Sequence, residues 1–227
     1  MNPFISFCLR ISLFLFTSLV LFAKPDSTEI NIKVGFKDSE TNLLADLINV
    51  EKITVSFSDS NLIGKKFMLS QVEYINGEKK EDKALIKCGK DTIKMVIGED
   101  TVYHILSDLC DRATYQEDDT LFMIHFLCDN SEDSSARIQI KYPGFFFDYP
   151  LPKKEEIGYM LRDLFVCSDY KGMFPFNKKI PIITFAPPFD VGNGAKDYCI
   201  LTNKPVEEWN KYYKLNHYVV FYLEIKD

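Results

Sequence analysis

Residues 67–83 read FMLSQVEYINGEKKEDK, and they predict an antiparallel β-hairpin. The first arm covers residues 67–75. Asn76 and Gly77 then make a two-residue turn, because both tolerate the positive φ angles that tight hairpins need. The returning arm, 78–83, is almost entirely charged, which is typical of an exposed edge strand. Antiparallel sheet is therefore the starting point for the rest of the chain.

Strand patterns continue on both sides of this hairpin. Apolar and polar residues alternate at 30–36 and 53–57, so each of these strands has one buried face and one wet face. The continuous apolar run at 121–128 is too short for a typical helix and is bounded by acidic loops, so we expect a central strand there. Further strands are expected at 84–88, 93–97, 138–142, 180–185, 198–201 and 218–225, the first two joined by a hairpin turn at 89–91.

Helical spacing of apolar residues, at every third or fourth position, occurs at 102–113 and 157–165. A shorter helix is expected at 205–213, and residues 42–50 also fit one. From residue 84 onward, the order strand–strand–helix is therefore repeated three times. These patterns predict an α+β fold that is mainly antiparallel sheet with about three helices. The alternative is an all-β sandwich in which the helical segments are strands.

Residues 1–23 have the three parts of a secretory signal peptide. Arg10 supplies positive charge near the start, residues 11–22 form an apolar run, and Ala23 is a small residue at the expected cleavage point. As a helix the run spans about 18 Å, well short of the roughly 30 Å hydrocarbon core of a membrane. An uncleaved anchor is the alternative, because Leu21 is larger than the residue usually found three positions before the cut.

The mature chain would then be residues 24–227, which we expect to form a single domain with its nearest candidate boundary at 143–152. No later segment is apolar for long enough to cross a membrane, so we expect a secreted protein or one in the periplasm or bacterial envelope. The full chain has a net charge of −6 at pH 7, and its cations are interspersed with acids. Because phosphate backbones need clustered cations, we do not expect nucleic acid as a partner.

The chain carries no common signature motif for nucleotide, metal or acyl-transfer chemistry, so we expect no cofactor, no metal and no assignable catalytic residue. His125 and Cys128 are three residues apart on one strand and would face opposite sides. The five cysteines after residue 23 lie on or beside apolar stripes, where a thiol stays protonated. A carboxylate pair would have to come from the acidic set Asp108, Asp111, Glu117, Asp118, Asp119 and Asp129.

One candidate binding segment is 143–150, which places four aromatic residues between two prolines. Prolines limit helix and ladder formation. Exposed rings such as Phe146 and Tyr149 would stack on a sugar or on a partner's side chain. The alternative is that these rings fill the core where the strands end.

A second candidate is 187–197, which we expect to be a loop of about ten residues, a length at which loops are often functional. Its two glycines would let backbone N–H groups form a small anion nest beside Lys196. Asp190 and Asn193 lie in the same loop. The alternative is a plain turn in which glycine and asparagine accept positive φ.

The sequence thus predicts an exported, non-enzymatic binding module for a glycan or an envelope protein. Its candidate binding residues are Phe146, Tyr149, Asp190, Asn193 and Lys196. The alternatives are a small secreted hydrolase, using unrecognised carboxylates or a Cys–His pair, and a structural subunit with an aromatic oligomer interface. A cleft with two carboxylates about 5–10 Å apart would favour the hydrolase, whereas an exposed aromatic patch would favour binding.

Overall fold

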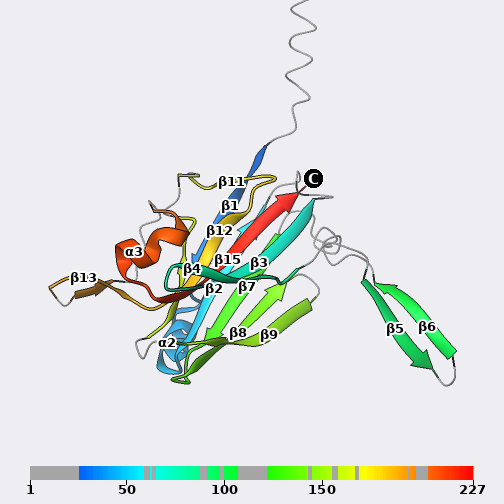
Figure 1. The fold of residues 1–227 in the computed structure, drawn as a ribbon, viewed down its shortest axis with the longest axis horizontal. Coiled ribbons are helices and arrows are strands. Elements are labelled where there is room, and N and C mark those ends of the chain that lie inside the picture. Colours follow the sequence, from blue (N-terminus) through cyan, green and yellow to red (C-terminus); the bar gives the residue numbers. More distant parts are fainter. Residues whose placement is uncertain are drawn as a thin grey trace, which may run out of the picture.

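The computed structural model of the chain shows two antiparallel β-sheets packed face to face (Figure 1). It describes residues 26–58, 62, 65–86, 91–97, 100–106, 122–142, 145–154, 158–166, 169–193, 195–197 and 204–226. The expectation of mainly antiparallel sheet is confirmed, since all the strand pairs in these residues run antiparallel.

The first sheet has six strands, in the spatial order β11-β1-β2-β7-β8-β9. Their bounds are Met173–Pro175, Ser27–Val34, Val50–Phe57, Phe122–Asp129, Ser135–Tyr142 and Phe145–Pro152, respectively. The second sheet has five strands, in the order β10-β12-β15-β3-β4. Their bounds are Met160–Asp163, Ile180–Ala186, His217–Lys226, Lys66–Ile75 and Glu78–Ala84. Both sheets thus combine strands from the first and second halves of the chain.

The remaining elements are small. Two separate hairpins pair β5 (Asp91–Ile97) with β6 (Asp100–Leu106), and β13 (Phe189–Gly192) with β14 (Ala195–Asp197). Figure 1 shows the β5–β6 hairpin projecting away from the two sheets. The helical elements are α2 (Ser39–Leu47), the 3-10 turn η3 (Val206–Glu208) and α3 (Trp209–Tyr213). No helix of the described residues is long and apolar enough to cross a membrane.

The main core lies between the two sheets and is rich in aromatic rings. Phe126 on β7 and Phe221 on β15 are both fully buried, and their ring centroids are 5.3 Å apart in an edge-to-face arrangement. Phe57 on β2 meets Phe67 on β3 in the same way at 5.8 Å. Because alternate residues of a strand face opposite sides, each of these strands gives one set of side chains to this core.

A second core cluster covers the outer face of the five-stranded sheet. Trp209 of α3 is 1% exposed and lies over Tyr218 of β15, with ring centroids 5.3 Å apart. The ring of Tyr74 on β3 also stacks on the ring of Tyr218, and their centroids are 4.9 Å apart. With η3 and α3 on one side and the six-stranded sheet on the other, β15 is buried on both faces.

The hairpin expected from residues 67–83 is confirmed. Asn76 and Gly77 have φ angles of 53° and 79°, the left-handed values that a two-residue turn of this type requires. β4 then runs along the edge of the five-stranded sheet, and all its residues are exposed. The short helix expected at 205–213 is confirmed as η3 with α3, and the one expected at 42–50 is present as α2 but begins and ends three residues earlier.

The two longer helices expected at 102–113 and 157–165 are wrong where the structure describes them. Residues 100–106 form β6, and residues 160–163 form β10, which pairs with β12. Leu161 on β10 is buried, and so are Leu164 and Phe165 in the bend that follows. The apolar residues of this four-residue strand and of the bend after it therefore recur at every third or fourth position, which is also the spacing of a helix.

Three further expectations change. The expected hairpin between 84–88 and 93–97 is wrong where the structure describes it, because β5 pairs with β6 and Ala84 pairs with Ser70 of β3. The segment at 187–197 is a hairpin, β13–β14, and not a plain loop. The expected strand at 198–201 lies outside the described residues. With these corrections, the chain is closer to the all-β alternative than to an α+β fold.

Candidate functional site

Among the described residues, the second core cluster covers the outer face of the five-stranded sheet, whereas neither core cluster covers the outer face of the six-stranded sheet. β7, β8 and β9 point alternate side chains outward there, because their other side chains are buried in the main core. At one end of β8 and β9 this face is hollowed. The hollow is the natural place to look for a ligand site.

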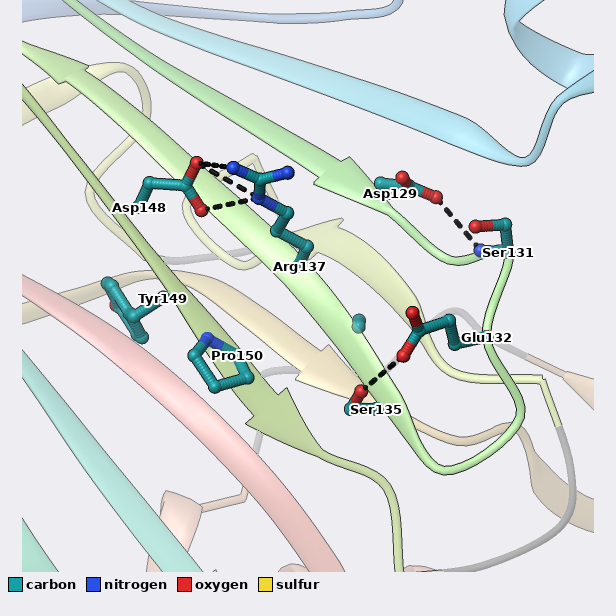
Figure 2. A pocket seen from close by; sticks show the side chains of 9 residues that line it. Asp129, Ser131, Glu132, Ser135, Arg137, Asp148, Tyr149 and Pro150 are labelled. Carbon is teal, nitrogen blue, oxygen red and sulfur yellow. Dashed lines mark hydrogen bonds and ion pairs between the residues drawn. The ribbon is translucent and has the colours of Figure 1, made fainter.

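The hollow is a cavity of about 490 Å³ with a polar lining (Figure 2). It is lined by Asp129, Ser131, Glu132, Ser135, Ala136, Arg137, Asp148, Tyr149 and Pro150. In Figure 2, Arg137 of β8 and Asp148 of β9 point toward each other over the sheet. The Arg137 guanidinium donates Nε–H to Asp148 Oδ1 at 2.8 Å and Nη2–H to Oδ2 at 2.6 Å.

The two other carboxylates of the cavity lie at the β7–β8 connection. The backbone N–H of Ser131 donates to Asp129 Oδ1 at 3.0 Å, and the Ser135 hydroxyl donates to Glu132 Oε2 at 3.1 Å. These two hydrogen bonds within the β7–β8 connection therefore hold the carboxylates of Asp129 and Glu132 beside the cavity, as Asp and Ser side chains commonly do in turns.

The electrostatics of the cavity favour binding over acid–base chemistry. The Arg137 guanidinium holds the pKa of Asp148 below its usual value, and hydrogen bonds from Ser131 do the same for Asp129. A catalytic general acid needs the opposite, a carboxyl whose pKa is raised toward neutrality. These two carboxylates stay ionised and act as hydrogen-bond acceptors.

Phe146 and Tyr149 both lie on β9, but they face opposite ways. Phe146 points outward and is 65% exposed. Tyr149 turns toward the five-stranded sheet, where its hydroxyl donates to Gln71 Oε1 at 2.7 Å and Lys83 Nζ lies 5.0 Å from its ring centroid. Tyr149 nevertheless contributes to the lining of the cavity, whereas Phe146 does not.

The proline-bounded segment at 143–150 does form a ladder, contrary to expectation. β9 pairs with β8 along its length, from Phe145 to Pro152. β9 is an edge strand, and proline is accommodated there because its missing N–H can face the free edge instead of the neighbour. The prolines therefore mark the edge of the sheet.

Asp190, Asn193 and Lys196 lie on the β13–β14 hairpin and not at the cavity. This hairpin rests on α3, with the rings of Phe189 and Tyr213 4.9 Å apart. The Asp190 carboxylate accepts the backbone N–H of Gly192 at 2.7 Å, which closes the turn. The five sequence-derived candidates are thus divided between two places: Phe146 and Tyr149 on β9, and Asp190, Asn193 and Lys196 on the β13–β14 hairpin.

Sequence reasoning missed Arg137, Glu132 and Ser135 in the cavity lining. Alternation along 138–142 implied that odd-numbered residues of this strand point outward, which includes Arg137. The pairing of Arg137 with Asp148 depends on the register of β8 with β9, and the sequence carries no signal for that register.

The Cys–His and carboxylate-pair alternatives find little support in the described residues. Cys128 is a free, buried thiol facing the main core, and burial raises its pKa, so it remains protonated. His125 points to the opposite face of β7, as expected. Within these residues no group of three or more His, Cys, Asp or Glu could hold a metal. The other five cysteines of the chain, and the acidic residues from Asp108 to Asp119, lie outside them.

A buried polar chain connects β3, the start of β15 and the residue before β10 within the five-stranded sheet. His217 is 1% exposed, with Nδ1 2.8 Å from the Tyr159 hydroxyl and Nε2 2.9 Å from Glu73 Oε1. Tyr159 is equally buried and stacks on Phe185. Because solvent does not reach the imidazole or the phenol, we assign this chain a structural role.

A second cavity, of about 440 Å³, lies between η3 and the five-stranded sheet. Its walls include Trp209 and Tyr222, which belong to the second core cluster. Its lining also includes the exposed residues Asp169, Pro205 and Glu207, so this cavity opens to solvent.

Comparison of the chain with known protein families, with curated proteins and with solved structures finds no match in any of the three. We therefore infer a function from the residues on the outer face of the six-stranded sheet.

Glu51 is a partly buried carboxylate that connects the two sheets. Its Oε2 accepts the backbone N–H of Leu161 on β10 at 2.6 Å, while Glu51 itself belongs to β2. Burial raises the pKa of Glu51, although Leu161 and the nearby cations Arg162 and Lys153 oppose the shift. A carboxyl whose folded-state pKa is raised favours folding when protonated, so this contribution is lost as pH rises through the folded-state pKa.

We therefore expect Glu51→Gln to raise the melting temperature more at pH 7.5 than at pH 4. Glutamine keeps an oxygen for the Leu161 N–H and removes the buried charge. Thermal unfolding at both pH values measures the effect, with Glu29→Gln on the exposed side of β1 as the control. A larger gain at pH 4, or equal gains in both variants, would contradict the burial argument.

Proposed function

We propose that the chain is an exported, non-enzymatic binding module that holds a glycan on the outer face of its six-stranded sheet. The observation that carries the proposal is an exposed aromatic ring, Phe146, on the same face of β9 as the Arg137–Asp148 pair and the cavity beside it.

Sugars suit such a surface for two physical reasons. The C–H faces of a pyranose ring pack on the face of an aromatic side chain, which adds apolar contact. Two neighbouring hydroxyls of a sugar can each donate or accept a hydrogen bond. A planar carboxylate offers two acceptor oxygens, and a guanidinium offers paired N–H donors, at a spacing that matches these hydroxyls. Asp148 and Arg137 present such groups, and the ion pair between them holds their orientation.

Glycan-array binding tests the proposal with two matched aromatic variants. Phe146→Ala should weaken the best glycan about fivefold or more, because an exposed anchor commonly contributes over 1 kcal/mol once a ligand covers it. Tyr212→Ala is the control, since Tyr212 is also exposed, at 44%, but lies on α3. Equal binding by the parent and Phe146→Ala, or equal loss in both variants, would contradict the proposed site.

A second candidate function is capture of a protein partner, and α2 is the observation that favours it. Leu43, Leu44, Leu47 and Ile48 are each more than 60% exposed on this helix. Contiguous exposed apolar residues commonly mark protein interfaces. A photo-crosslinker at Leu47, compared with one at the exposed Asn31, would yield one specific cross-linked protein only at Leu47 if α2 binds a partner.

Export gives a further expected result. Mass spectrometry of the native protein should find an N-terminus at Lys24, within a few residues, because residues 11–22 and Ala23 resemble the processed part of a signal peptide. Intact Met1 in the membrane fraction would instead show the anchor.

A further inference from the structure

We propose that the glycan held on the outer face is acidic, and that a cationic row centred on His125 binds its carboxylate or sulfate groups. This inference rests on the proposed function and names the ligand class. The row is defined by residues that pair across five adjacent strands: Lys33, Thr54, His125, Lys141 and Phe146.

The register of the sheet aligns these side chains. Lys33 of β1 is opposite Thr54 of β2, Thr54 is opposite His125 of β7, His125 is opposite Lys141 of β8, and Lys141 is opposite Phe146 of β9. Directly opposed residues point to the same face. Their chain neighbours, such as Ile53 and Ile140, are buried in the main core, so the row points to solvent. Four strand spacings make the row about 19 Å long.

The row lacks an opposing charge of its own. Lys33, Lys141 and the adjacent Lys52 form no ion pair with a carboxylate among the described residues. Lys52 lies instead over the Phe36 ring, with its Nζ 5.2 Å from the centroid. On a chain with a net charge of −6, three uncompensated cations around one histidine form an attractive site for anions.

His125 makes the row sensitive to pH. Its Nδ1 is 3.0 Å from the Thr54 hydroxyl, so the ring is held in place. Partial burial lowers the pKa of His125, and Lys52 and Lys141 lower it further. The groups that face it are Thr54 and Lys52 from β2 and Lys141 from β8, while Lys33 of β1 lies one strand farther along the row. A bound anion would offset these cations and favour the imidazolium, so affinity should rise as pH falls.

Other polyanions fit the face less well. Protein interfaces are depleted of lysine, whereas this face presents Lys33, Lys52 and Lys141 within four adjacent strands. Nucleic acids need a larger cationic footprint to offset a phosphate at every nucleotide. The cavity at the end of the face adds the carboxylates of Asp129 and Glu132, which repel a dense polyanion. A glycan with sparse acidic groups avoids that repulsion.

The test compares acidic and neutral glycans on four proteins. The probes are a uronic-acid oligosaccharide, its carboxyl-reduced neutral form, a sulfated oligosaccharide, a hexamer of glutamate and a short single-stranded DNA. The proteins are the parent, the double variant Lys33→Gln/Lys141→Gln, the matched double variant Lys178→Gln/Lys211→Gln on exposed lysines elsewhere, and His125→Gln. Calorimetry at pH 5.5 and 7.5 gives the affinities.

We expect the parent to bind an acidic oligosaccharide at least fivefold more tightly than the neutral form, with weaker binding at pH 7.5 than at pH 5.5. Lys33→Gln/Lys141→Gln should lose this preference, the matched variant should keep it, and His125→Gln should abolish the pH dependence. The carboxylated and sulfated probes distinguish the two sources of negative charge.

Three outcomes would overturn the inference in distinguishable ways. Equal binding of acidic and neutral glycans, with Phe146→Ala still defective, would leave the proposed function standing and remove the acidic ligand. Failure of all glycans would remove both. Tighter binding of the glutamate hexamer or DNA than of any glycan would assign the row to a different polyanion.

Discussion

Phe126→Ala should lower the free energy of unfolding by about 3–5 kcal/mol, whereas Phe146→Ala should change it by less than about 1 kcal/mol. The two rings belong to the same six-stranded sheet, yet Phe126 is fully buried and Phe146 is 65% exposed. Truncating Phe126 removes its edge-to-face contact with Phe221 and leaves a cavity between the sheets. Chemical denaturation of both variants measures the difference.

The same pair of variants is also the folding control for the glycan-binding experiment. If Phe146→Ala unfolded the protein, its loss of glycan binding would have no bearing on the outer face. Similar destabilisation by both truncations would mean that the Phe146 ring fills the core, the alternative that the sequence left open.

Trp209→Ala should have a comparable effect, again about 3–5 kcal/mol, through the other core. Trp209 closes the outer face of the five-stranded sheet, and its indole N–H donates to the carbonyl of Lys204 at 3.2 Å. Without the indole, Tyr218 loses the ring that lies over it. For a chain of this size the melting temperature should fall by roughly 6–20 °C.

Tyr212→Ala provides the matched aromatic control, because it lies in the same helix and is 44% exposed. We expect a shift of about 1 °C or less for this variant. If Trp209→Ala were equally mild, η3 and α3 would be an accessory cover and not part of the cooperative core.

Strand positions could be predicted where the chemistry is local. The Asn76–Gly77 turn and the charged arm after it depend on residues that are neighbours in sequence, and both were correct. The alternation at 53–57 and the apolar run at 121–128 also predicted β2 and β7. Alternation indicates a strand with one buried face, and a continuous apolar run indicates a strand that is buried on both faces.

The errors arose where tertiary pairing decides the structure. Residues 160–163 form a strand because β12 offers them a ladder, and that partner is about twenty residues away in the chain. The apolar residues around them were correctly recognised as buried, but their spacing fits a helix as well as a short strand and a bend. Local pattern cannot distinguish these two cases.

The candidate site shows the same limit. Phe146 could be selected because four aromatics in one short segment are unusual. The row from Lys33 to Phe146 combines residues from five strands, so it exists only once every register in the sheet is set. No single segment of the sequence carries that arrangement.

The central place of β15 has a consequence for synthesis of the chain. β15 follows every other strand in sequence, yet it lies between β12 and β3 and is buried on both faces. A nascent polypeptide that has not yet emerged past residue 217 therefore lacks the strand around which both cores close. Long-range pairing of this kind forms late, because its loop-closure entropy must be offset first. The chain therefore cannot complete its fold until residues 217–226 have left the ribosome. Until then, the apolar strands of the chain remain accessible to chaperones.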